Sequence, residues 1–277
     1  MVTATNYNAV IASGVTRIGC GKALGDAGIL FCGDSNMCGD GGGVDTSLDR
    51  PSNDVFHWTK TSPYIDEIHR VNANSAPYLD HSLNSLKNEV GPDLPFLDRF
   101  GAERGDRRIV GLPAGDSGSG FSTAQWFSGQ EMYALAVSLV NNFLAANVDN
   151  SIEAIVIELG ANDVLDFTTA IWQGHLDNLI TEFRSTAFTG NAAQPSFAAV
   201  PVVVIGLPPD WYTGVIARQE IQDVIEGTPN RFSKCGYAST AGLASQSGDS
   251  IHLSGASNRI LGSTNMWTAF LAAETDT

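Results

Sequence analysis

The chain has 277 residues, of which 43% are hydrophobic and 16% are charged, a balance that excludes a disordered protein. Thirty acidic against 15 basic residues give a formal net charge of -15, which repels phosphate backbones and anionic lipid surfaces. Nucleic acid and membranes are therefore not expected as partners. We expect one globular domain over residues 1–277, and the sequence leaves its oligomeric state open.

The N-terminal segment "MVTATNYNAV" has neither a basic region nor an apolar core, and no apolar stretch is long enough to span a bilayer. We expect a soluble chain without a signal peptide or transmembrane segment, which is compatible with secretion after processing and leaves the compartment open. Four cysteines without C-x-x-C spacing predict no structural metal. Cys32 ends an apolar run and is expected in the core. Three others lie beside glycines and are candidates for a surface disulfide: Cys20, Cys38 and Cys235.

Apolar runs alternate with segments of helical periodicity along the chain. Four short runs rich in β-branched residues are predicted as buried strands: 28–32, 107–114, 152–160 and 200–208. Apolar residues at helical spacing predict four helices: 132–143, 171–183, 213–226 and about 255–273. This order predicts parallel strands joined by crossover helices, in a three-layer α/β architecture. Residues 40–106 are rich in Gly, Pro, Asn and Asp, and we expect long loops with short helices there, near the active site.

The tripeptide Gly-Asp-Ser occurs three times, in "FCGDSNMCGDG", "AGDSGSG" and "SGDSIHL". Ligands of an open parallel sheet bind at the carboxyl ends of its strands. Ser35 directly follows the first predicted strand on a Gly-Asp turn, where its hydroxyl is exposed as a nucleophile requires. Ser117 lies in a Gly- and Ser-rich run that favours close backbone approach to a bound anionic group. Ser250 is flanked by Asp249 and His252, which are the more informative residues of the third copy.

A serine hydroxyl needs a base to take its proton, and that base needs an acceptor for its other nitrogen. His252, with Asp249 three residues earlier, satisfies both needs within one loop. His175 lies on the apolar face of a predicted helix and is expected in a structural role. Structural roles are also expected for the histidines of the loop-rich region, which lack such a carboxylate: His57, His69 and His81. Donors for a developing oxyanion are offered by the glycines of "GSGFS" and by Asn162 in "ELGANDV".

The order "GDSN", a Gly-rich block, "GAND" and "DSIH" resembles the four sequence blocks of the SGNH (GDSL-type) hydrolases. The sequence resembles in particular the carbohydrate O-acetylesterases of the sialate acetylesterase and acetylxylan esterase type, through "GDSNM", "VGPDLPFLDRF", "GSGFSTAQW" and "DSIHLSG". This resemblance covers most of the chain. It implies a flavodoxin-like α/β/α sandwich with a central, mainly parallel five-stranded sheet, and a serine esterase that needs no metal and no cofactor. Asp34 and "GAND" depart from the carbohydrate-esterase pattern, which has Gln and Gln-Gly-Glu at these places.

The resemblance implies a role for each matching residue. Ser35 is expected to be the nucleophile, His252 the general base and Asp249 the residue that orients it. The oxyanion hole is expected to comprise the backbone N–H of Ser35, the backbone N–H of Gly120 and the side-chain amide of Asn162. Gly118 is the alternative to Gly120, since "GSGFS" allows two alignments.

The expected activity is hydrolysis of short-chain acyl esters, chiefly acetyl groups on carbohydrate. The alternatives are a general short-chain or lipase-like esterase acting on non-sugar esters, and a catalytically weak carbohydrate-binding relative. Five aromatic residues suit either sugar stacking or core packing: Phe56, Trp58, Tyr64, Trp126 and Trp211.

Overall fold

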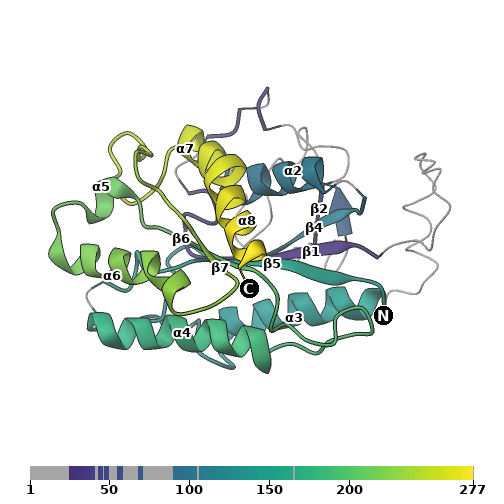
Figure 1. Cartoon of the computed structure of the whole chain (residues 1–277). Helices are drawn as coiled ribbons and strands as arrows, with labels where there is room; N and C mark the ends of the chain where they lie inside the picture. The colour runs from purple at the N-terminus through teal and green to yellow at the C-terminus, as the bar shows by residue number, and fades with distance from the viewer. Residues whose placement is uncertain are drawn as a thin grey trace.

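The computed structural model describes residues 25–40, 43–45, 47–49, 55–58, 68–70, 90–104, 106–164 and 166–276. Within them, seven strands form one sheet in the order β3-β2-β4-β1-β5-β6-β7 (Figure 1). β3 is antiparallel to β2, and every other neighbouring pair is parallel. The three-layer, mainly parallel fold is therefore confirmed. Five neighbouring strands, β4-β1-β5-β6-β7, have the flavodoxin-like order. β2 and β3 extend the sheet beyond β4, so it is two strands wider than the expected five.

The four strands expected from apolar runs are all present: β1 (Ala27–Gly33), β4 (Ile109–Gly115), β5 (Ser151–Glu158) and β6 (Val202–Ile205). β1 and β4 are buried along their whole length, as parallel strands covered on both faces should be. β7 (Cys235–Ala238) was not predicted, because it has four residues and no apolar run. A Cβ added at Gly236 would lie 2.0 Å from the carbonyl oxygen of Ala269, so contact with the C-terminal helix requires this glycine.

The region 40–106 is more regular than the expected loops with short helices. Its described residues form β2 (Val55–Trp58), β3 (Ile68–Arg70) and the eleven-residue helix α2 (Asp93–Glu103). β2 pairs with β4, and β3 with β2. Three- and four-residue strands carry too few residues to show a period of two in the sequence, which is why they were missed.

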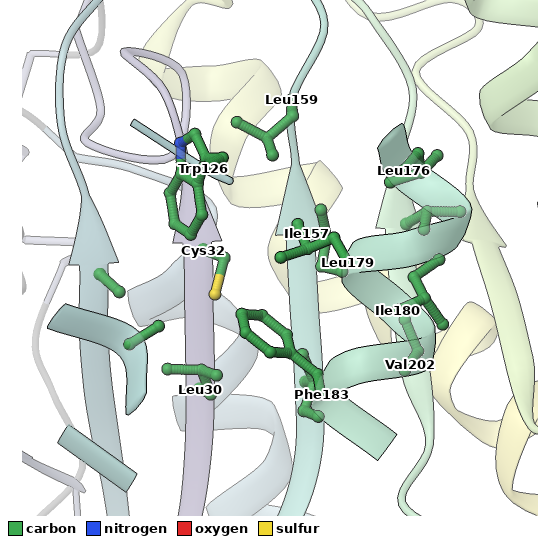
Figure 2. Packing of buried hydrophobic residues seen from close by; sticks show 14 of the residues in the cluster. Leu30, Cys32, Trp126, Ile157, Leu159, Leu176, Leu179, Ile180, Phe183 and Val202 are labelled. Carbon is green, nitrogen blue, oxygen red and sulfur yellow. The ribbon is translucent and has the colours of Figure 1, made fainter. Parts of the chain in front are cut away.

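Two groups of helices cover the two faces of the sheet (Figure 1). One face packs against α3 (Glu131–Ala146), α4 (Thr169–Ser185) and α6 (Ile216–Glu226). Figure 2 shows side chains of α4 meeting those of β1 and β5 in this layer of the core. α6 begins at Ile216 rather than at 213, because the short helix α5 (Pro209–Tyr212) precedes it and Gly214 turns the chain with a left-handed φ of 79°. A 3₁₀ turn, η1 (Thr228–Asn230), follows α6.

The opposite face packs against α2 and the C-terminal helix. The single helix expected over 255–273 consists of three consecutive parts: α7 (Gly255–Ile260), the π-helical turn η2 (Leu261–Met266) and α8 (Trp267–Thr275). A Cβ added at Gly262 would lie 2.0 Å from the Pro92 carbonyl oxygen at the start of α2. The π-helical turn thus coincides with the closest approach of α2, a packing constraint that helical periodicity does not reveal.

The strand register brings three strand ends to one level. Gly33, the last residue of β1, pairs with Gly115 of β4 on one side and with Glu158 of β5 on the other. The loops that begin at these residues contain Ser35, Gly120 and Asn162. Among the helices of the described residues, none has the length and apolar character needed to cross a bilayer.

Candidate active site

The turn after β1 holds Ser35 in a fixed position. Asn36 N–H donates to Asp34 Oδ1 at 3.1 Å, and Asp40 N–H donates to the Ser35 carbonyl at 2.9 Å. A Cβ at Gly33 would lie 2.4 Å from Met37 Cβ, so the turn closes this tightly only over glycine. Ser35 is 5% exposed, so the expectation of an exposed hydroxyl was wrong: the residue is buried and its hydroxyl contacts a partner within the site.

Asn36 joins this turn to the loop that contains His252. Its Nδ2 donates to the Ile251 carbonyl at 2.9 Å, and its Oδ1 accepts from Leu253 N–H at 3.0 Å. The two bonds flank His252 on both sides and hold the loop against the Ser35 turn. Asn36 was not predicted as a site residue. Its position directly after Gly-Asp-Ser in "GDSN" was the available signal.

Ser35, His252 and Asp249 form a continuous hydrogen-bonded chain. Ser35 Oγ lies 2.9 Å from His252 Nε2, and His252 Nδ1 lies 2.5 Å from Asp249 Oδ2. The hydrogen bond from His252 lowers the pKa of Asp249, which favours its ionised form. A carboxylate only accepts, so Nδ1 is the donor of that contact, and in a neutral imidazole Nε2 is then the nitrogen that accepts from the Ser35 hydroxyl. This is the tautomer in which an imidazole can take a proton from serine.

Asn162 lies beside the serine turn, on the loop after β5. Its Nδ2 donates to Asp34 Oδ2 and to the Ser119 carbonyl, both at 3.1 Å. The Asn162 side chain thus joins the loops after β1, β4 and β5, and its role in an oxyanion hole stays a prediction, because both amide hydrogens are donated to protein acceptors in the structure.

The two glycine alternatives differ in their surroundings. Gly120 N–H donates to Thr123 Oγ1 at 3.0 Å, and a Cβ at Gly120 would lie 2.4 Å from Asp163 Oδ1. Gly118 is exposed and has a left-handed φ of 81°. Within the described part of the chain, Ser35 N–H donates to no acceptor of the protein, whereas Gly120 N–H would have to leave Thr123 to contact an oxyanion. The roles of both glycines remain predictions.

The serines of the other two Gly-Asp-Ser copies contact no histidine among the described residues. Ser117 Oγ donates to Asp40 Oδ2 at 2.6 Å, and the expected approach of this loop to an anionic group stays a prediction. Ser250 is exposed, and its carbonyl accepts from Ser245 Oγ at 3.1 Å. Of the three serines, Ser35 is the one that contacts a histidine in the structure.

His175 lies on α4 among three phenylalanine rings, with centroids 4.8 to 5.4 Å away. It is not part of the serine site. His57 is buried in β2, the side chain of His69 is outside the described residues, and so is His81.

Cys32 is buried in the core, as expected. Cys38 and Cys235 are free thiols, so the expected disulfide does not join them, and Cys20 lies outside the described residues.

Three of the five aromatic residues predicted for sugar stacking or core packing have described side chains. Trp126 is buried and donates to Ser119 Oγ at 3.1 Å, and Trp211 stacks under Arg218 at 3.3 Å from its ring centroid. Phe56 lies under Arg108, at 4.9 Å from the ring centroid. The side chain of Trp58 and all of Tyr64 lie outside the described residues.

The three-layer fold and this chain of side chains agree with the class predicted from the sequence, the serine ester hydrolases. Residues 28–271 match the family described as carbohydrate esterase, sialic acid-specific acetylesterase. The chain belongs to this family and is a carboxylic ester hydrolase, so the resemblance seen in the sequence is confirmed. No curated protein matches the sequence.

Solved structures of similar fold are distant in sequence. A protein of Arabidopsis thaliana superposes with a TM-score of 0.67 at 17% identity, over 89% of this chain and 98% of its own. NanS superposes with a TM-score of 0.68 at 14% identity, over 90% and 98%. A carbohydrate acetylesterase of Xanthomonas citri gives 0.60 at 13% identity, over 91% of this chain and 57% of its own. At these identities the likeness shows a shared fold.

Replacing Asn162 with alanine is expected to lower kcat for p-nitrophenyl acetate by about 100-fold or more, because one oxyanion donor is lost. The two lost hydrogen bonds should cost about 1 to 2 kcal/mol of stability, so the variant should still fold. Steady-state kinetics with a thermal unfolding curve checks both expectations. Asn142→Ala, on the exposed face of α3, is the matched control. A normal kcat for the Asn162 variant would remove this side chain from the oxyanion hole.

Proposed function

We propose that the chain hydrolyses short-chain acyl esters, with acetyl groups on carbohydrate as the favoured substrate, through an acyl-enzyme on Ser35. The hydrogen-bonded chain from Ser35 through His252 to Asp249 is the observation that carries this proposal. Family membership supports acetyl esters as substrates. The name of the Xanthomonas citri neighbour, a carbohydrate acetylesterase, supports a sugar as the alcohol.

In the first half-reaction, Ser35 Oγ attacks the ester carbonyl carbon while His252 Nε2 takes the hydroxyl proton. The carbonyl oxygen becomes an oxyanion, which accepts hydrogen bonds from Ser35 N–H and the Asn162 amide. His252 then gives its proton to the leaving alcohol as the ester bond breaks. Asp249 holds His252 in the required orientation and stabilises the imidazolium.

In the second half-reaction, His252 takes a proton from water as that water attacks the acyl-serine carbonyl. Collapse of this intermediate breaks the bond to Ser35 Oγ, which takes the proton back from His252. Carboxylic acid is released, and the two half-reactions together return Ser35 and His252 to their starting bonds and charge.

A substrate screen tests the proposed specificity. We expect a higher kcat/KM for acetylated xylose or O-acetylated sialic acid than for p-nitrophenyl butyrate and octanoate, with p-nitrophenyl acetate as the acyl-matched control. A preference for octanoate over acetate would indicate a lipase-like esterase instead. Binding of sugar acetates without hydrolysis of any ester would indicate a catalytically weak carbohydrate-binding relative.

A further inference from the structure

A pair of buried carboxyl groups lies directly behind the serine turn. Asp34 and Glu158 are 0% and 1% exposed. Neither forms an ion pair with a basic side chain in the described part of the chain. Two buried carboxylates in contact cannot both remain ionised at modest cost, because each loses hydration and repels the other.

The hydrogen-bond donors around the pair are unevenly distributed. Asp34 N–H and Met37 N–H both donate to Glu158 Oε2, each at 3.3 Å. Glu158 Oε1 is buried and, within the described residues, receives no N–H or hydroxyl donor. The contact of Asp34 N–H with Glu158 Oε2 brings the two residues together, and both Asp34 oxygens also accept a hydrogen bond, Oδ1 from Asn36 N–H and Oδ2 from Asn162 Nδ2. A proton on Asp34 would donate to Glu158 and supply the missing hydrogen bond.

The surroundings of Asp34 favour this placement of the proton. Burial and the neighbouring Glu158 raise the pKa of Asp34 well above its usual value, and burial also raises the pKa of Glu158. Asp163, on the loop after β5, adds a further negative charge that faces Asp34. The Cys38 thiol faces Asp34 from the same turn, and burial with four neighbouring aspartates raises its pKa well above the usual value.

We propose that Asp34 and Glu158 hold one proton between them, carried by Asp34, and that neutral Asp34 is a positioning residue for the Asn162 amide. Asn162 Nδ2 donates to Asp34 Oδ2 at 3.1 Å, in the same turn as the nucleophile. A neutral carboxyl group is a weaker acceptor than a carboxylate, so it orients the amide yet releases a hydrogen to a developing oxyanion. An ionised Asp34 would retain the amide and place a negative charge beside the oxyanion. The catalytic part of this inference rests on the proposed function, whereas the shared proton does not.

Thermal unfolding across pH tests the shared proton without any assay of activity. If Asp34 is protonated when folded and ionised when unfolded, wild-type folding takes up a proton, and stability falls as pH rises above about 4, the unfolded value. D34N carries no such proton. The Tm of D34N relative to wild type should therefore rise steadily from pH 4 toward neutral pH. D223N, which removes an exposed carboxylate on α6, should show no such trend. A Tm difference between D34N and wild type that is constant over this range would overturn the proposal.

Kinetics across pH tests the positioning role. Wild-type kcat should decline at alkaline pH as the pair loses its proton, with KM nearly constant, because the oxyanion forms after substrate binds. D34N should have a kcat lower by about tenfold at neutral pH, less than the loss for Asn162→Ala, and no alkaline decline. E158Q removes the negative charge that keeps the proton on Asp34. The alkaline decline of kcat in E158Q should therefore begin at lower pH than in the wild type. Identical pH profiles for wild type, D34N and E158Q would contradict the positioning role. If the Tm of D34N relative to wild type rises with pH as predicted but the wild type hydrolyses no ester, the shared proton is supported and the proposed function is refuted.

Discussion

Ser35→Ala is expected to abolish measurable hydrolysis of p-nitrophenyl acetate, a loss of about 10⁴-fold or more in kcat. The reason is that the hydroxyl attacking the carbonyl carbon is removed, while Asn162 and the backbone donors remain to bind substrate. Removing one buried hydroxyl should leave the fold intact, so the Tm should stay close to that of the wild type. Initial rates under saturating substrate, with an unfolding curve for each protein, provide the test.

The other two copies of the tripeptide supply matched controls for this variant. Ser117→Ala and Ser250→Ala remove a hydroxyl from the same Gly-Asp-Ser context, but neither serine contacts a histidine in the structure. Both variants should retain activity. If Ser117→Ala or Ser250→Ala lost as much activity as Ser35→Ala, the assignment of the nucleophile by its contact with His252 would fail.

Asp249→Asn is expected to lower kcat by about 100-fold or more, approaching the ~10⁴-fold loss that the same change causes in a buried protease triad. The amide can donate to His252 Nδ1, which stabilises the tautomer in which Nε2 carries a hydrogen and cannot accept from Ser35. The Asp249 side chain is 36% exposed, so water can partly replace its hydrogen bond, and the loss should be smaller than in a buried triad.

The pH dependence of wild-type activity tests which residue of the Ser35–His252–Asp249 chain limits activity at acid pH. His252 lowers the pKa of Asp249, so Asp249 stays ionised at pH values where an ordinary aspartate begins to take up a proton. An imidazole takes up its proton at higher pH than such a carboxylate does. Activity should therefore fall toward acid pH while Asp249 is still ionised. Asp116→Asn, from the second tripeptide copy, should retain the wild-type profile. Wild-type activity independent of pH on the acid side would contradict the role of His252 as base.

The order of strands and helices was predictable because each long element has a clear period in the sequence. β1, β5 and α4 are long enough to show uninterrupted apolar runs or helical spacing. β7 and the two short strands after residue 50 were missed because they are stabilised by pairing with neighbours rather than by their own composition. The π-helical turn at Gly262 was missed because its cause is the approach of α2, far away in the chain.

The candidate site was predictable to the level of single side chains at strand ends, and less so at the level of hydrogen bonds. Ser35, His252 and Asn162 were found because they follow strands or lie in motifs. The two bonds of Asn36 that flank His252 depend on how two loops pack, which residue order does not reveal. The pairing of Asp34 with Glu158 across 124 residues was equally hidden, although both positions lie at strand ends.

Covalent trapping of the nucleophile tests the central claim most directly. Diethyl p-nitrophenyl phosphate should release one p-nitrophenol per chain and leave a diethylphosphoryl group on the peptide that contains Ser35, detected by mass spectrometry after digestion. His252→Ala should slow this labelling strongly, because the base is absent, while Ser117→Ala should be labelled as fast as the wild type. Labelling at any other residue, or none in an enzyme that hydrolyses p-nitrophenyl acetate, would contradict the account.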